Sequence, residues 1–205
     1  MSPNKRAYKF LLLIFFCSCF FSVSTKAQQT VGLIPEAGEL GPGSEHINAD
    51  HAGKNLDETD LSGSYIESSD FSESSLERSQ FIEANIISSD FSKAVLSDST
   101  FEIAYLENSN FSDANLSNSN LSGITIVDSD FSNANLTGAN LSGAGLWGVT
   151  LDGVRSGGIT GLSATLPSGW KLINGFLIGP KANLSNADLS GTDLSGATLD
   201  SVRSG

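Results

Sequence analysis

The chain has 205 residues, of which 39% are apolar and 17% charged, and 11 Lys and Arg stand against 23 Asp and Glu for a formal net charge of −12. A protein this acidic lacks the clustered cations that contact nucleic acid phosphates, so we expect no nucleic acid partner. Only 5 Pro and 21 Gly exclude a collagen-like chain.

The N-terminal segment 1–27 is typical of a Sec signal peptide. Three basic residues precede an apolar run at 10–23, and Thr25 and Ala27 provide small residues at the −3 and −1 positions. We therefore expect cleavage after Ala27 and a secreted or periplasmic protein without a membrane span after cleavage. A membrane anchor is the alternative, but the run is shorter than the roughly 17–25 residues of a spanning helix.

Both cysteines of the chain, Cys17 and Cys19, lie inside this apolar run. Lipoprotein processing at Cys19 is a third interpretation, which Phe16 disfavours because an aliphatic residue belongs at that position. Cleavage after Ala27 leaves a mature chain with no thiol, and therefore no disulfide, thiolate metal site or cysteine nucleophile.

Residues 28–53 lack the regular pattern of the rest of the chain, and their Gly and Pro residues suggest a linker or N-terminal cap. They contain the two histidines, His46 and His51, next to Glu45 and Asp50. This set could be read as zinc ligands. Five-residue spacing in a Gly-rich segment without further ligands favours a solvated linker, and we expect no metal or cofactor.

From residue 54 to 153, a large apolar residue recurs at every fifth position. Twenty consecutive positions from Leu56 to Leu151 are all Leu, Ile or Phe, and the position two residues before each is mostly Ala or Ser. A period of five fits neither a helix nor a simple strand, and it predicts short extended segments joined by bends. The predicted structural core includes Phe71, Phe81, Phe91, Phe101, Phe111, Leu116, Phe131 and Leu136.

The pattern Ala-Asn-Leu-Ser-Asn at 114–118, with similar motifs at 134–138 and 187–191, resembles the pentapeptide-repeat family. The resemblance covers 54–153 and 182–201 and implies an all-β fold, a right-handed quadrilateral β-helix with four pentapeptides per coil. The residues themselves support four per coil, because Phe71, Phe91, Phe111 and Phe131 stand at every fourth pentapeptide. We expect five coils over 54–153, about 24 Å long at a strand spacing of about 4.8 Å.

The five-residue step stops between 154 and 181, where Asn174-Gly175 stands between two apolar runs. Asn-Gly in this position predicts an inserted β-hairpin with a type I′ turn. We expect the hairpin to pack against the solenoid, with Trp147 of the preceding coil as its contact. Core packing is also our interpretation of Trp170, although carbohydrate-binding proteins use exposed Trp as well.

Residues 182–205 provide a further repeat coil and then the start of a second interruption. The heptapeptide at 199–205 repeats that at 151–157 with one change. We interpret the chain as a truncated part of a longer array. Self-association through an uncapped C-terminal coil edge is the alternative.

An acidic row precedes one set of the large apolar positions. Asp70, Asp90 and Asp130 recur at the coil spacing and are followed two positions later by serines. A calcium-binding ladder is one interpretation; the other is that Asp and Asn serve the bends by bonding nearby backbone. Together with Trp147 and Trp170, these residues form the tentative interaction surface.

No residues in the repeat are typical of a catalytic site, since the repeat contains no histidine for Ser-His-Asp chemistry. The leading hypothesis is a secreted, non-enzymatic repeat scaffold that mediates protein–protein or cell-envelope interaction through rigid acidic faces, with an unidentified partner. Alternatives are a calcium-dependent surface protein and an acidic DNA mimic. Residues 54–153 carry a net charge of −13, similar to family relatives that mimic DNA and shield topoisomerases, although export argues against a cytoplasmic target.

Overall fold

The computed structural model describes residues 40–161 and 164–204, and this part of the chain contains eight short strands and no helix. The predicted signal peptide and its cleavage site lie outside the described residues. No helix long and apolar enough to cross a bilayer occurs within 40–161 or 164–204. The strands are β1 (Glu45–Ile47), β2 (Tyr65–Glu67), β3 (Asn85–Ile87), β4 (Tyr105–Glu107), β5 (Thr125–Val127), β6 (Gly145–Trp147), β7 (Lys171–Ile173) and β8 (Phe176–Ile178).

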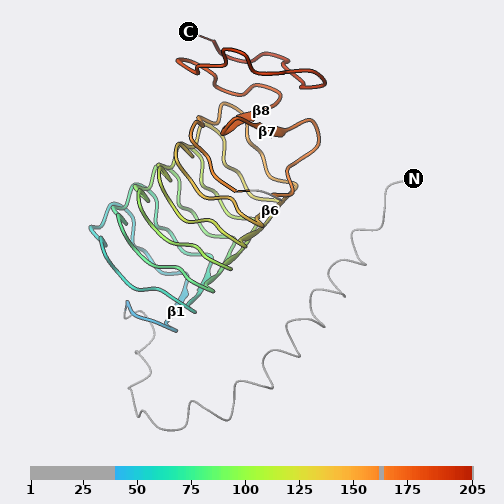
Figure 1. The fold of residues 1–205 in the computed structure, drawn as a ribbon. Coiled ribbons are helices and arrows are strands. Elements are labelled where there is room, and N and C mark those ends of the chain that lie inside the picture. Colours follow the sequence, from blue (N-terminus) through green and yellow to red (C-terminus); the bar gives the residue numbers. More distant parts are fainter. Residues whose placement is uncertain (1–39, 162–163, 205) are drawn as a thin grey trace. The chain divides into compact units, whose positions relative to one another are not determined.

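Strands β1 to β6 form one parallel sheet in which each strand pairs with the next strand along the chain, so that Ile66 lies opposite Ile86 (Figure 1). The other three sides of each coil are joined by isolated parallel bridges at the same spacing, for example Asp70 to Asp90, Ser75 to Val95 and Gln80 to Thr100. Four paired sides in every coil make the coil quadrilateral. The predicted all-β fold, a right-handed quadrilateral β-helix, is therefore confirmed.

The corners of the coil explain the step of five. In the pentapeptide that begins with Phe71, the N–H of Ser74 donates to the Phe71 carbonyl at 3.2 Å, and Glu73 between them has a φ of 57°. A hydrogen-bonded turn with positive φ at its third residue is a type II turn. Asp113 and Asn133 adopt the same conformation at the equivalent corners of later coils. The chain thus bends sharply once per pentapeptide.

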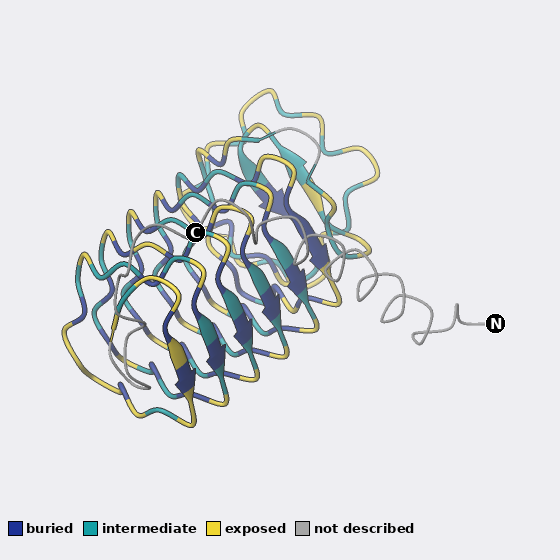
Figure 2. Cartoon of the chain, turned by 90° about the horizontal axis from the view of Figure 1, so that it is seen from below, coloured by how far each residue is buried: buried dark blue, intermediate teal, exposed yellow. Residues whose placement is uncertain are grey.

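The interior consists of stacked side chains from the fifth positions. Phe71, Phe91, Phe111 and Phe131 lie one above another, with ring centroids 4.8, 4.9 and 4.9 Å apart. Such separations lie in the favourable range for aromatic pairs. The eight residues of the predicted core are between 0 and 2% exposed, and in Figure 2 buried positions recur at the same place in successive coils.

A ladder of buried serines lines the corner that follows the strands of the sheet. The N–H of Ser69 donates to Ser89 Oγ at 3.1 Å, and the N–H of Ser89 donates to Ser109 Oγ at 3.2 Å. Each hydroxyl donates in turn to a carbonyl two residues earlier, as Ser89 does to Ile87. Buried hydroxyls are costly unless bonded, and this corner satisfies them with backbone groups.

The β-helix begins earlier than the sequence pattern indicates, so the interpretation of His46 and His51 as part of a solvated linker is wrong. His46 lies in β1 opposite Ile66 and is fully buried, and His51 is 7% exposed. The His51 ring lies 4.6 Å from the ring of Phe71 and continues the phenylalanine stack. Histidine fills these apolar slots because its nitrogens find partners within the first coil.

The predicted interruption is also shorter than 154–181. Val154 and Ile159 are buried, and Thr160 and Thr165 still bridge to the coil before them. The period is hidden in the sequence because Ser156 replaces a large apolar residue, while the smaller inward slots remain apolar. The chain regains the ladder at residue 183, which bridges Arg155 on one side and Arg203 on the other.

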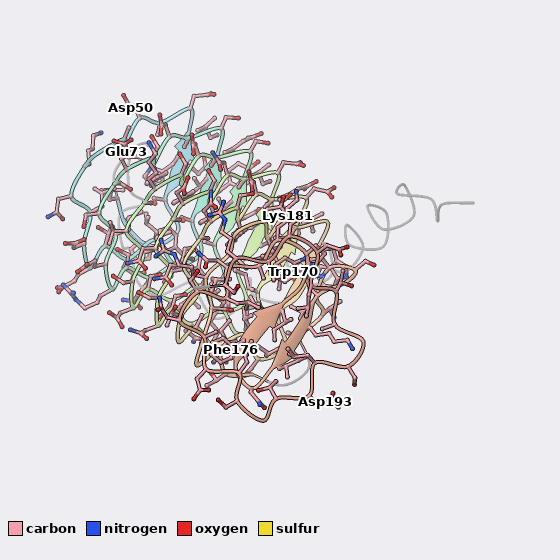
Figure 3. All side chains as sticks on the ribbon, turned by 90° about the horizontal axis from the view of Figure 1, so that it is seen from above. Asp50, Glu73, Trp170, Phe176, Lys181 and Asp193 are labelled. Carbon is pink, nitrogen blue, oxygen red and sulfur yellow. The ribbon has the colours of Figure 1, made fainter. Side chains whose placement is uncertain are left out.

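The predicted hairpin is confirmed as β7 and β8, which pair antiparallel. Asn174 and Gly175 both have positive φ, 50° and 80°, as a type I′ turn requires. Leu177 is buried in the main core, and Trp170 packs against that core. Trp170 and Phe176 lie at the hairpin in Figure 3, where they also contact a second small core beneath the C-terminal coil. The hairpin therefore joins the two apolar clusters.

Candidate binding surfaces

The predicted acidic row is present as a ladder, and its carboxylates hold the bends. Asp70, Asp90 and Asp130 are half-buried, and each accepts the N–H two residues later at 2.8 Å. Hydrogen bonding to Ser72 lowers the pKa of the Asp70 carboxyl below its ordinary value. Asn110 occupies the same row and donates its amide to Asp90 at 3.0 Å. The row therefore has a structural task, and Asp70 remains charged at neutral pH.

Trp147 and Trp170 occupy different environments. Trp147 is 49% exposed, and its six-membered ring covers Gly145 of the same strand, where an added Cβ would come within 1.9 Å of the ring. Trp170, not Trp147, is the tryptophan that packs between the hairpin and the solenoid core. The ring of Trp147 fills the space that glycine leaves at position 145, and its expected contact with the hairpin stays a prediction.

Two Tyr–Glu pairs on the parallel sheet were not predicted from the sequence. The hydroxyl of Tyr65 donates to Glu67 at 3.0 Å, and that of Tyr105 donates to Glu107 at 3.0 Å. Burial and the bond to Glu107 raise the pKa of the Tyr105 hydroxyl. The sequence contains a signal for the pairs, because the two Tyr-x-Glu motifs, at Tyr65 and Tyr105, are separated by the length of two coils. The five-residue repeat of large apolar residues is the stronger regularity in this part of the sequence, so the spacing of the two motifs is easily overlooked.

A chain of polar contacts runs through the first coil. Ser44 Oγ lies 2.9 Å from His46 Nε2, and His46 Nδ1 lies 3.2 Å from His51 Nε2. A serine beside a histidine resembles an activated nucleophile. Ser44, however, is 1% exposed, so a substrate could not reach it. Burial lowers the pKa of both histidines, and the neutral pair serves to fill the end of the stack.

Basic side chains gather where the C-terminal coil joins the solenoid. A hollow of about 340 Å³ is lined by Asp152, Lys181 and Arg203, and a neighbouring hollow of about 300 Å³ adds Arg155. Lys181 is ion-paired with Asp152, and both side chains are well exposed. Exposed pairs of this kind contribute little stability. No side chain lining either hollow is a histidine or cysteine, so neither hollow has a nucleophile beside a base of that kind.

Among residues 40–161 and 164–204, no group of three or more His, Cys, Asp or Glu side chains is arranged to hold a metal ion. The carboxylates of the acidic row lie on successive coils and bond backbone groups instead of converging. The described surface therefore offers rows of regularly spaced side chains, together with the two hollows lined by Asp152, Lys181, Arg155 and Arg203.

Comparisons with known families agree with this geometry. Residues 84–160 match the family model described as a pentapeptide repeat region, and residues 59–98 and 180–203 match the model for pentapeptide repeats in eight copies. No curated protein matches the chain.

Several solved structures are similar to the chain. A pentapeptide repeat protein from the thylakoid lumen of Arabidopsis thaliana is 26% identical, over 51% of this chain and 66% of its own, with a TM-score of 0.24. QnrB1, a plasmid-mediated fluoroquinolone resistance protein, is 18% identical over 82% and 85%, with a TM-score of 0.35. HetL, involved in heterocyst differentiation regulation in the cyanobacterium Nostoc, is 19% identical over 70% and 86%, with a TM-score of 0.26. The matches to the family models agree with the coil register of the structure.

Proposed function

Because the chain belongs to the pentapeptide-repeat family, we propose that it is a secreted, non-enzymatic scaffold that binds a protein or a cell-envelope component through rigid acidic faces. The observation that carries this proposal is the fixed spacing of charge on the coils. Residues 40–204 contain 21 acidic and 7 basic residues, and hydrogen bonds between coils hold their backbone in register. A surface that is already rigid loses little conformational entropy on binding.

The buried Ser44 and His46 support a role without catalysis. Their contact is the one serine–histidine hydrogen bond seen among the described residues, and it lies inside the core. Export is supported by the sequence of segment 1–27, whose basic start, apolar run and small residues at 25 and 27 fit a signal peptide. An exported scaffold would meet envelope components or other exported proteins first.

Envelope binding tests the proposal. The full-length precursor is expressed with its own N-terminus, and mass spectrometry of the exported product should place the new N-terminus at Gln28. Binding of this protein to isolated cell envelopes of the source organism is then measured by co-sedimentation at low and high salt. We expect binding that weakens as salt rises, because exposed charges are screened.

A triple variant locates the binding face. Asp70→Asn, Asp90→Asn and Asp130→Asn together should reduce envelope binding, and the bends should survive because Asn110 makes the same backbone bond as the Asp residues. The matched control changes three acids of the C-terminal coil, Asp188, Asp193 and Asp200, to Asn. Equal loss in both triple variants, or no envelope binding at all, would contradict the proposed role of the acidic row.

A second candidate is an acidic DNA mimic that binds a topoisomerase. The observation that favours it is the charge of −13 over residues 54–153, carried on coils at a regular spacing. The purified protein would then inhibit DNA supercoiling by gyrase, and inhibition would fall as salt rises. Supercoiling that is unaffected by excess protein would eliminate this candidate.

Self-association at the C-terminal coil stays a prediction. Leu199 in that coil is 40% exposed, and Leu189 and Leu194 are half-buried. Sedimentation velocity at two protein concentrations, with Leu199→Ser for comparison, distinguishes a monomer from a self-associating chain.

A further inference from the structure

Aromatic rings lie along every second strand of the parallel sheet. Tyr65 in β2 and Tyr105 in β4 each reach a glutamate two residues further along the same strand, so their rings lie along the strand instead of standing upright. In β6 the ring of Trp147 lies back over Gly145. Tyr65, Tyr105 and Gly145 occupy the same register position, two coils apart. The three rings therefore form one row, which we term the aromatic row.

The aromatic row has a regular period. Parallel strands are about 4.8 Å apart, so rings on every second strand recur at about 9.6 Å. The strands between them carry smaller outward residues at the same register, Asn85 in β3 and Thr125 in β5. A flat face with rings at this interval matches an extended polymer that presents the same face once per two of its own units.

The charge of this face selects the kind of polymer. Glu67 and Glu107 lie beside the two tyrosines, Glu45 lies at the end of the sheet, and strands β1 to β6 contain no Lys or Arg. An anionic polymer would be repelled by these carboxylates. A polymer that carries ammonium groups would be attracted both by the carboxylates and by the ring faces, through cation–π interaction.

We propose that the aromatic row binds an extended β-1,4-linked polysaccharide of amino sugars, of the chitosan type. In a β-1,4-linked chain each sugar is turned by half a revolution from its neighbour, so the same C–H face recurs at every second sugar. These C–H faces stack on the three rings, and the sugar ammonium groups pair with Glu67 and Glu107. This inference rests on the proposed binding role and names the partner class and the face.

Retention of the full-length chain on chitosan beads tests the proposal. We expect retention at low salt that falls as salt rises. The double variant Tyr65→Ala/Trp147→Ala should weaken retention by about tenfold or more, since aromatic contacts of this kind contribute roughly this much in total. Glu67→Gln/Glu107→Gln should also weaken retention and remove most of its salt dependence. Ile103→Ala is the matched control, because Ile103 is an exposed apolar residue, 59% exposed, outside the sheet.

Either of two results in the retention experiment would overturn the proposal. One is retention that stays unchanged in the Tyr65/Trp147 variant while circular dichroism shows it to be folded. The other is binding to cellulose or fully acetylated chitin that equals binding to chitosan and ignores salt. The triple Asp→Asn variant of the acidic row should keep chitosan binding. Envelope binding that persists without chitosan binding would overturn this inference alone, whereas loss of both would also remove the proposed function.

Discussion

Truncation of one stacked phenylalanine gives a direct measure of what holds the coils together. Phe111 is fully buried, stacks at 4.9 Å on both Phe91 and Phe131, and meets Phe101 edge-on at 6.3 Å. Replacing a buried Phe by Ala costs about 3–5 kcal/mol, because apolar contacts are lost and a cavity remains. Small folded domains are stable by about 5–15 kcal/mol. Phe111→Ala should therefore fold but unfold at a much lower urea concentration.

Phe81→Ala and Ser112→Ala make this prediction specific. Phe81 is equally buried but has one stacked neighbour, Phe101 at 4.5 Å, so its truncation should cost less than that of Phe111 by about 0.5–1.5 kcal/mol. Ser112 points outward, and its change to Ala should stay within about 0.5 kcal/mol. Urea unfolding followed by circular dichroism gives all three free energies. If Ser112→Ala cost as much as Phe111→Ala, the inward and outward positions would be misassigned.

Three further outcomes follow from the fold. Burial lowers the pKa of His46 and His51 in the folded chain, while the unfolded value is about 6.5. The stability that the two neutral histidines contribute is therefore fully present above that pH and is lost as the pH falls below it. Melting at pH 5 should be lower than at pH 7.5, and His46→Ile/His51→Phe should flatten the difference. Gly175→Ala should destabilise the hairpin by about 1–2 kcal/mol, because φ is 80° and the new Cβ would meet Gly158 at 3.1 Å; an unchanged melting temperature would contradict the type I′ turn. Millimolar calcium should leave the melting temperature unchanged, because the acidic-row carboxylates bond backbone N–H groups. A rise of several degrees would instead favour the interpretation of the row as a calcium-binding ladder.

The solenoid could be predicted well because one physical requirement repeats without exception from Leu56 to Leu151. Every coil must fill the same interior, so the large apolar residue is visible at each step. His46 and His51 were not recognised as core residues because histidine is a polar residue type, and their contacts with Ser44, Phe71 and each other are visible only in the structure. The continuation of the coil through residues 154–165 was not predicted, because only the smaller inward positions, such as Val154 and Ile159, remain apolar there.

The binding surfaces were harder to predict, because outward positions are free of the packing requirement. The acidic row was found because its spacing repeats, but the choice between a calcium ladder and bonding to the backbone required coordinates. The ring of Trp147 over Gly145 depends on a missing side chain two residues away, which a search for functional residues does not consider. The Tyr–Glu pairs depend on the direction in which each tyrosine leans.

The return of the chain to its ladder after the hairpin has a practical consequence. Arg155 bridges Asn135 on one side and Asn183 on the other, so the longer step to Asn183 ends in the same pairing as the regular step from Asn135. The additional residues include the hairpin, whose Leu177 and Trp170 pack against the solenoid core. An insertion at this point therefore has to bring its own apolar contacts, and a foreign peptide that replaced residues 167–180 should expose both apolar clusters to water.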